Sequence, residues 1–307
     1  MWSFYMIPTA MTRIGFIGLG NMGRPMASNL VRKGERVLVM DVNPAPVRAL
    51  VELGAVEATS TADVAACDVV FTMLPTTTVV ADVIGGPTGV LSHVRPGAVI
   101  VDMSTIDPLV TDRLASAAAA KGVAFADAPV GRLASHAERG ESLFMVGATP
   151  ETFTRITPLL DKMGTTVHHC GGPGSGMRTK LVNNYLAIVS CAFNAEAIAL
   201  AQRFGLDLAR TLDVIHGTTA TNGQLKMAWP SKVLKGDTTP GFTIDLAHKD
   251  LTLIVEAANA VKVPVPIAAI ARESFSTARA GGQGDKDFSA MLDVLCDRAG
   301  ISRARLT

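Results

Sequence analysis

Four positions near the start of a long apolar stretch are spaced so that their side chains could act together. Lys180 is followed by Asn183, Asn184 and Ala187 at i+3, i+4 and i+7, which places all four on one face of an α-helix. The residues around them are apolar, and an ammonium ion is costly to bury unless other groups hydrogen-bond to it. The pattern predicts a polar cluster lining a cleft between two domains, where Lys180 could give a proton to a substrate.

The stretch that carries this cluster is typical of a long helix. It opens with a glycine-rich turn, residues 171–176, and continues for roughly thirty residues without proline or glycine until Gly205. Such a turn suits a boundary between domains. We therefore predict a flexible N-terminal extension over residues 1–11, an α/β domain over residues 12–173 and a helical domain for substrate binding and oligomerisation over residues 174–307.

A G-x-G-x-x-G sequence stands between a short apolar strand and a helix pattern, which is the context that dinucleotide binding requires. Gly18 makes the tight turn, Gly20 lets the backbone approach a pyrophosphate, and Gly23 allows close packing of helix and strand. The pyrophosphate then lies at the helix N-terminus, where N–H groups and the helix dipole favour anions. We expect two further cofactor contacts within this loop, Asn21 and Met22.

An acidic residue, Asp41, ends the next buried strand, residues 37–40. A carboxylate at this distance from the glycines accepts hydrogen bonds from the ribose hydroxyls of the cofactor. The same charge would repel a 2′-phosphate, and no arginine follows Asp41 directly. The sequence therefore predicts NAD(H) in preference to NADP(H).

Strands and helices alternate up to residue 169, which predicts a mostly parallel, doubly wound (Rossmann) sheet. Ligands bind at the carboxyl ends of the strands in such sheets. Further cofactor contacts are expected at Leu74, Pro75 and Thr105, and Ser104 is expected to line the substrate.

Beyond residue 176 the chain changes to helical patterns almost throughout, which predicts an all-α second domain joined to the first by the long helix. The helices after it are expected near residues 207–217, 222–235, 246–261, 266–280 and 286–299.

The composition excludes several classes of protein. A net charge of +1 gives no basis for nucleic-acid binding, and no apolar run reaches the length of an uninterrupted membrane span. The four cysteines are widely spaced, without a CxxC pair, and the histidines have no partners at ligand spacing, so no metal site is predicted. The pattern favours a reduced, cytoplasmic enzyme.

Four sequence blocks together resemble the β-hydroxyacid dehydrogenase family, over the whole chain after residue 11. The blocks are Gly18-Leu-Gly-Asn-Met-Gly-Arg-Pro-Met26, Asp127-Ala-Pro-Val130, Gly174-Ser-Gly-Met-Arg-Thr-Lys180-Leu-Val-Asn-Asn184 and Lys249-Asp250-Leu251. The resemblance implies NAD(P)-linked reduction of small aldehyde acids by a homodimer or homotetramer. It also implies that Lys180 is the catalytic lysine, that Asn184 is the helix asparagine, and that Lys249 lies beside the cofactor and the substrate.

One block departs from the family pattern. Many members continue Asp-Ala-Pro-Val with Ser-Gly-Gly, which binds a substrate carboxylate, whereas this chain continues Gly131-Arg132-Leu133. An arginine offers a fork of N–H donors suited to an anion with several oxygens. We therefore expect Gly131, Arg132 and Asn183 to bind the anionic tail of a small aldehyde, with a sulfonate favoured.

Several alternatives remain open at this stage. Ala187 offers no donor to the anion, which weakens the case for a sulfonate and leaves a carboxylate semialdehyde of the succinic, tartronic or 3-hydroxyisobutyric type. An imine reductase and a non-catalytic dinucleotide-binding module are further alternatives, and the presence of Lys180 argues against both. As the proton donor, Lys180 would be made more acidic by partial desolvation and by the neighbouring cation Lys249.

Overall fold

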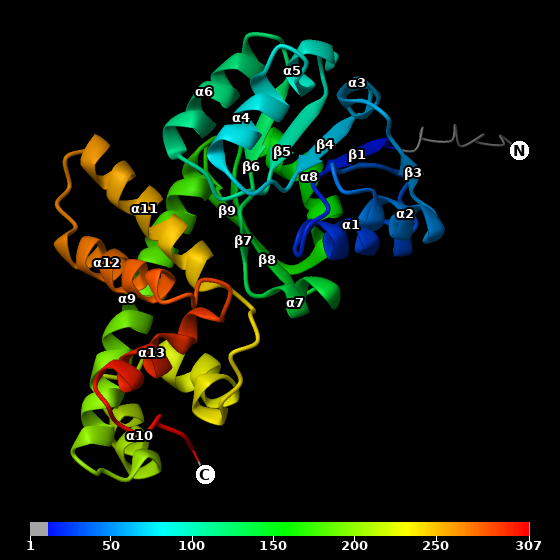
Figure 1. Ribbon diagram of the computed structural model, residues 1–307. Coiled ribbons are helices and arrows are strands. Elements are labelled where there is room, and N and C mark those ends of the chain that lie inside the picture. Colours follow the sequence, from blue (N-terminus) through cyan, green and yellow to red (C-terminus); the bar gives the residue numbers. More distant parts are fainter. Residues whose placement is uncertain (1–11, 307) are drawn as a thin grey trace, which may run out of the picture. The chain divides into compact units, whose positions relative to one another are not determined.

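The computed structural model describes residues 12–306, so the predicted N-terminal extension lies outside the described residues. Internal contacts divide the chain into two units, one ending at Lys180 and the other beginning at Leu181 (Figure 1). The sequence placed the boundary at residue 174, before the long helix. The division falls inside that helix, α9 (Ser175–Arg203), because its first turn is hydrogen-bonded to a strand of the first unit.

The first unit contains a nine-stranded sheet in the order β3-β2-β1-β4-β5-β6-β8-β7, with β9 also pairing with β8. Strands β1 to β6 pair with one another in parallel, β8 is antiparallel to β6 and β7, and β9 is parallel to β8. The predicted Rossmann-like fold is confirmed. The strands are β1 (Ile14–Ile17), β2 (Val37–Met40), β3 (Val56–Glu57), β4 (Val69–Thr72), β5 (Val99–Asp102), β6 (Ala124–Asp127), β7 (Val130–Gly131), β8 (Ser142–Gly147) and β9 (Gly164–Gly171).

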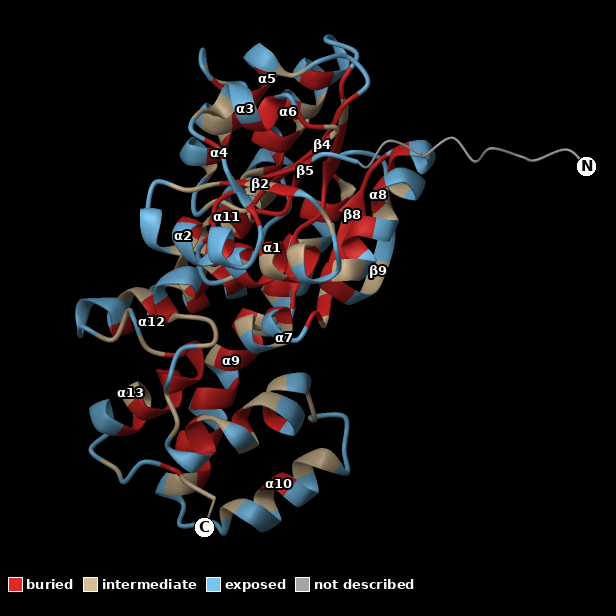
Figure 2. Ribbon diagram, turned by 90° about the vertical axis from the view of Figure 1, so that its right-hand side faces the viewer, coloured by how far each residue is buried: buried red, intermediate tan, exposed pale blue. Residues whose placement is uncertain are grey.

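The central strands are short apolar runs that are buried on both faces, as parallel sheets require. Every residue of β1, β4 and β5 is buried, and Figure 2 shows β4 and β5 coloured as buried. Two apolar clusters cover the sheet, one including residues of α1, α2 and α8 and the other residues of α3 to α6. The helices are α1 (Gly23–Arg32), α2 (Pro44–Glu52), α3 (Thr61–Ala65), α4 (Thr77–Gly85), α5 (Val90–His93), α6 (Pro108–Ala119), α7 (Ala134–Glu138) and α8 (Pro150–Met163).

The second unit is helical, as predicted, and packs around one apolar cluster that includes Ile188 of α9, Trp229 and Phe275. Residues 222–235 do not form the single α-helix that was expected. Gln224–Ala228 is a turn of π-helix, and two short 3₁₀ segments follow, because Pro230 has no N–H to continue the helix. The regular helices are α10 (Leu208–His216), α11 (Ile244–Ala260), α12 (Pro266–Ala280) and α13 (Met291–Arg298).

Helix α9 is long and apolar enough to cross a membrane when judged by length and composition alone. Half of its most apolar window is nevertheless buried inside the structure. Asn184 and Asn194 are also buried in it, and both are hydrogen-bonded to side chains of the helical unit. These features are those of a core helix in a globular unit.

Candidate active site

Four parallel strands, β1, β4, β5 and β6, lie next to one another and end at the same edge of the sheet. Backbone hydrogen bonds continue the ladder beyond the strands into the loops that carry the predicted site residues. They join Met73 N to Ile17 O at 2.9 Å, Met103 N to Thr72 O at 2.8 Å, and Ala128 N to Asp102 O at 2.7 Å. The loops after these strands are therefore held together at one edge.

The glycine loop after β1 has the geometry that its sequence predicts. Gly18 has φ +94°, and a Cβ on it would lie 2.2 Å from the carbonyl oxygen of Met73. A Cβ on Gly23 would lie 1.9 Å from the oxygen of Gly18, so the start of α1 can pack here only without a side chain. Gly20 has open space around its Cβ direction, which leaves room for a bound group against the backbone.

Asp41, directly after β2, is fastened to the glycine loop. Its Oδ2 accepts a hydrogen bond from Leu19 N at 2.5 Å, and its Oδ1 accepts one from Asn43 N at 2.7 Å. Each carboxylate oxygen keeps a further lone pair for a ribose hydroxyl. The loop and Asp41 therefore fit a nicotinamide dinucleotide, with the diphosphate at α1 and the ribose at Asp41. The other predicted cofactor contacts lie on the loops after β1, β4 and β5: Asn21, Met22, Leu74, Pro75 and Thr105.

Ser104, predicted to line the substrate, is fully buried and links the ends of two strands. Its hydroxyl donates to Asp102 Oδ1 at 2.6 Å and accepts from Leu74 N at 2.9 Å, while Thr72 Oγ1 donates to the same Asp102 oxygen at 2.8 Å. The single hydroxyl proton of Ser104 is thus used inside the protein. A direct substrate contact for Ser104 stays a prediction, and its visible role is to hold the backbone of Leu74.

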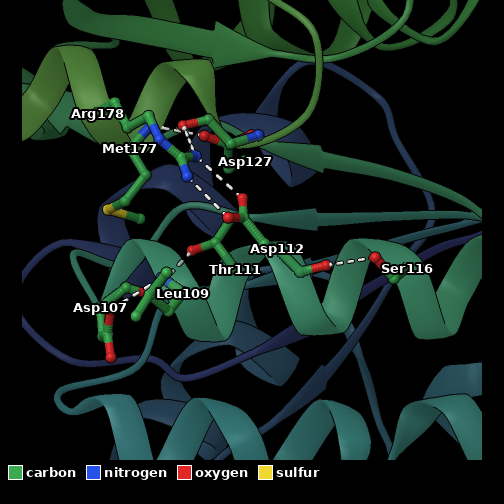
Figure 3. A network of polar contacts seen from close by, with 9 residues as sticks. Asp107, Leu109, Thr111, Asp112, Ser116, Asp127, Met177 and Arg178 are labelled. Carbon is green, nitrogen blue, oxygen red and sulfur yellow. Dashed lines mark hydrogen bonds and ion pairs between the residues drawn. The ribbon is translucent and has the colours of Figure 1, made fainter. Parts of the chain in front are cut away.

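Asp127, the last residue of β6, binds the first turn of α9. Its two carboxylate oxygens accept hydrogen bonds from Gly174 N and Met177 N, each at 2.6 Å, and the residue is fully buried. Figure 3 shows Asp127 beside Met177 and Arg178, whose guanidinium also forms a two-pronged ion pair with Asp112 of α6. Burial, with a smaller contribution from the nearby Asp102 charge, raises the pKa of Asp127 to about 6, against hydrogen bonds that favour the charged form.

This raised pKa predicts how stability depends on pH. A carboxyl group that binds its proton more tightly in the folded than in the unfolded state favours folding at low pH, and that advantage is lost as pH rises from 3.8 to about 6. A shift of this size corresponds to about 3 kcal/mol. The uncharged Asp127→Asn variant should lack this contribution. Thermal unfolding should be measured at pH 4.5 and at pH 7.5. The stability of the variant, relative to that of the natural protein, should be greater at pH 7.5 than at pH 4.5. The same difference in stability at both pH values would contradict the raised pKa of Asp127.

Lys180 ends the first unit and is half-buried. Its Nζ donates a hydrogen bond to the carbonyl oxygen of Val130 at 2.8 Å, in the segment that follows β6. The ammonium group is therefore directed to the carboxyl edge of the sheet, where the loops after β1, β4 and β5 also end. Its role as proton donor stays a prediction that this placement suits.

Arg132 has an unusual backbone and a well-anchored side chain. Its φ is +70°, in the left-handed region that favours glycine. Its Nη1 donates to the carbonyl oxygen of Glu141 at 2.5 Å and to Thr165 Oγ1 at 2.8 Å, and its Nη2 donates to Thr166 Oγ1 at 3.2 Å. The side chain is exposed, and the hydrogen bonds that anchor it all run through Nη1 and Nη2. The preceding Gly131 is buried in β7.

The other predicted residues form a hydrogen-bonded chain within the helical unit. Asn183 donates through Nδ2 to Asn184 Oδ1 at 3.1 Å, and Asn184 donates through Nδ2 to Asp250 Oδ2 at 2.6 Å. Lys249 Nζ lies 3.2 Å from the other oxygen of Asp250. The buried Asp250 thus orients Asn184 and Lys249 together. Asn184 is one helical turn beyond Lys180 in α9, so the two side chains leave the helix on the same face.

Sequence reasoning missed three acidic residues of this arrangement, Asp102, Asp127 and Asp250. Asp127 and Asp250 were named only as parts of motifs, without a role. All three are buried, and Asp102 and Asp127 each end an otherwise apolar strand. A carboxylate in such a position is a detectable signal because burying it requires compensating donors.

The comparisons with known proteins identify the family of the chain. Residues 13–172 match the family model of the NAD-binding domain of 6-phosphogluconate dehydrogenase, and residues 174–295 match the model described as NAD-binding of NADP-dependent 3-hydroxyisobutyrate dehydrogenase. The chain therefore belongs to the β-hydroxyacid dehydrogenase family, and it is an NAD(P)-dependent oxidoreductase.

Individual relatives cover nearly the whole chain. It is 44% identical over 293 residues to 3-sulfolactaldehyde reductase of Escherichia coli K12, covering 95% of this chain and 98% of that protein. It is 40% identical to 2-(hydroxymethyl)glutarate dehydrogenase of Eubacterium barkeri, covering 94% and 97% respectively. Among solved structures, 3-hydroxyisobutyrate dehydrogenase of Mycobacterium tuberculosis superposes with a TM-score of 0.86 at 33% identity, covering 93% of this chain and 99% of that one.

Proposed function

We propose that this protein uses NADH to reduce 3-sulfolactaldehyde to 2,3-dihydroxypropane-1-sulfonate. The observation that carries the proposal is Arg132, which occupies a left-handed backbone position beside the lysine site and presents a guanidinium edge for an anion. The 44% identity to a sulfolactaldehyde reductase supports the same substrate.

Arg132 is built to hold an anion with several oxygens. Three hydrogen bonds donated by Nη1 and Nη2 to Glu141, Thr165 and Thr166 fix the plane of its guanidinium group. The Nε–H and the second Nη2–H lie on one edge of that plane, and two donors in this arrangement match a sulfonate or a carboxylate in a bidentate contact. A side chain already fixed in place loses little entropy when it binds the ligand.

Lys180 supplies the chemistry at the aldehyde. The bound cofactor would supply the hydride to the carbonyl carbon. The oxygen that gains negative charge then needs a proton, and Lys180 Nζ donates it in place of its hydrogen bond to Val130. The ammonium also stabilises the developing alkoxide before the proton moves. Asn184, whose amide group donates to Asp250, is the residue that we propose to orient the substrate oxygen.

Asp41 sets the cofactor preference that we propose, NADH over NADPH. Asp41→Asn removes the charge that opposes a 2′-phosphate and keeps the shape of the side chain. We expect the ratio of kcat/KM for NADH to that for NADPH to fall by at least about tenfold, because like charges in contact cost several kcal/mol. Steady-state kinetics with both cofactors measures the ratio. Glu52→Gln, an exposed change at the end of α2, is the matched control, and an unchanged ratio in Asp41→Asn would contradict the role of Asp41.

A carboxylate semialdehyde is the second candidate substrate, favoured by the 40% identity to 2-(hydroxymethyl)glutarate dehydrogenase and by Ala187. The deciding measurement is kcat/KM with NADH for 3-sulfolactaldehyde and for succinic semialdehyde side by side. A preference for the sulfonate of about a hundredfold supports the proposal, since that ratio corresponds to about 2.7 kcal/mol of selective binding. Equal values, or a preference for the carboxylate, would make the protein a general semialdehyde reductase.

We also propose that the enzyme is a cytoplasmic homodimer or homotetramer that associates through its helical unit. Large apolar side chains are exposed there, among them Leu186, Phe204, Val214 and Ile270, each at least half exposed. The four cysteines are free thiols, as a reducing compartment favours. Sedimentation of the purified protein and fractionation of the source cells would test the two statements separately.

A further inference from the structure

The residue that caps α9 comes from far away in the sequence. Asp127 precedes its two partners, Gly174 and Met177, by 47 and 50 residues. A helix cap from an adjacent residue stabilises a helix wherever the helix lies. A cap from the end of β6 does more, because it also fixes the first turn of the helix relative to the sheet.

The contact between this turn and the sheet is close enough to exclude side chains. A Cβ on Gly147 of β8 would lie 2.4 Å from Asp127 Oδ1, and a Cβ on Gly176 of α9 would lie 2.2 Å from the carbonyl oxygen of Met145. The helix therefore begins directly against the backbone of β6 and β8. Small shifts of the turn are resisted on both sides.

The same short strand segment also holds Lys180. Val130 follows Asp127 by three residues, and Lys180 follows Met177 by three residues, or about 4.5 Å along the helix axis. Met177 N donates to Asp127 Oδ2 at 2.6 Å, and Lys180 Nζ, three residues further along the helix, donates to Val130 O at 2.8 Å. Two hydrogen bonds thus join one turn of α9 to the short segment from Asp127, at the end of β6, to Val130.

We propose that Asp127 is the positioning residue for the proton-donating Lys180, because its carboxylate fixes the helical turn from which the lysine reaches the edge of the sheet. This inference rests on the proposed role of Lys180 in aldehyde reduction. The carboxylate of Asp127 accepts from the N–H groups of Gly174, just before α9, and of Met177, in its first turn, and acts on the reaction through Lys180.

The energetics support this role. Burial raises the pKa of Asp127 to about 6, so its charged form costs stability at neutral pH despite the two bonds to α9. The charged carboxylate therefore keeps both bonds to the start of α9 at a cost in stability. Departures from the most stable choice are expected at functional sites, where geometry is maintained at the expense of stability.

The test uses Asp127→Asn in the full-length protein. The asparagine keeps one acceptor oxygen but places an NH₂ group against the second backbone N–H, so the first turn of α9 loses one bond and shifts. We expect kcat to fall by about 10- to 100-fold, since a displacement of about 1 Å can cost a hundredfold. The dissociation constant for NADH, measured by fluorescence titration, should stay within about threefold, because the glycine loop and Asp41 are untouched.

Asp112→Asn is the matched control. It makes the same chemical change beside the same helical turn, but it removes an ion pair with Arg178 whose side chains are 41% and 50% exposed. Exposed pairs contribute little, so kcat should stay within about threefold of the natural value.

A double variant separates positioning from general damage. If Asp127 acts through Lys180, then Asp127→Asn added to Lys180→Met should lower the residual kcat by less than about threefold, because the group that it positions is already absent. A further drop as large as that in the single variant would overturn the proposal, as would a normal kcat in Asp127→Asn beside an inactive Lys180→Met. Near-normal activity of Lys180→Met alone would instead contradict the proposed function.

Discussion

Replacing Lys180 with methionine should lower kcat for aldehyde reduction by about 10²- to 10⁴-fold, the range that a positioned general acid contributes. Methionine keeps most of the length of the side chain but can neither give a proton nor stabilise an alkoxide. The binding of NADH should change little, because Lys180 bonds to Val130 rather than to the glycine loop. Stopped-flow measurement of NADH oxidation in a single turnover gives the rate of the chemical step directly.

Two further variants make this result specific. Lys180→Arg keeps a positive charge but cannot lose a proton near neutral pH, so activity retained in it would show charge stabilisation rather than proton transfer. Lys121→Met is the matched control, because Lys121 Nζ also donates to a backbone carbonyl in this unit, that of Leu91 at 2.7 Å. A loss of less than tenfold in Lys180→Met would remove Lys180 from the mechanism.

The fold was predictable because its signals are local. Each central strand is a four-residue segment that is apolar except for Thr72 at the end of β4 and Asp102 at the end of β5, and each is followed by a turn or a helix start within a few residues. The glycine loop is similarly explicit, since Gly18 and Gly23 are required by contacts that a short motif already implies. The prediction of one helix over residues 222–235 was wrong. The residues after Asn222 favour a helix, but Pro230 and the packing of Trp229 divide the segment into short π and 3₁₀ turns.

The site was predictable only in part, because several of its contacts join distant segments. Spacing on a helix was enough to predict Lys180 and Asn184 as candidates, since both lie on one element. Nothing local links Asp127 to Gly174, or Asn184 to Asp250 across 66 residues. Such bonds depend on which strand ends lie together, and that follows from the sheet order rather than from a motif.

The backbone conformation of Arg132 is energetically unfavourable, so the arginine side chain must bring a benefit that offsets this cost. A non-glycine residue at φ +70° costs about 1–2 kcal/mol. The Ser-Gly-Gly continuation that the family resemblance implies would place a glycine here and avoid that cost. A strained residue that persists at the edge of a candidate site indicates a functional reason for the side chain.

Arg132→Ala and Arg132→Gly should both lose the preference for 3-sulfolactaldehyde over succinic semialdehyde, by about a hundredfold in the ratio of kcat/KM. Two charge-assisted hydrogen bonds to the anion account for an effect of that size. The two variants should differ in stability, because only glycine relieves the left-handed backbone. We expect Arg132→Gly to be more stable than Arg132→Ala by about 1 kcal/mol in chemical unfolding.

The pair of variants distinguishes recognition from strain, since they share the loss of the guanidinium and differ only in the backbone. Arg132→Lys completes the set: it keeps the charge without the fork, and should recover only a small part of the sulfonate preference. If all three variants kept the natural ratio of kcat/KM while losing stability, the three bonds to Glu141, Thr165 and Thr166 would be the whole role of Arg132. The sulfonate would then have to be recognised elsewhere, and the carboxylate semialdehydes would become the better-supported substrates.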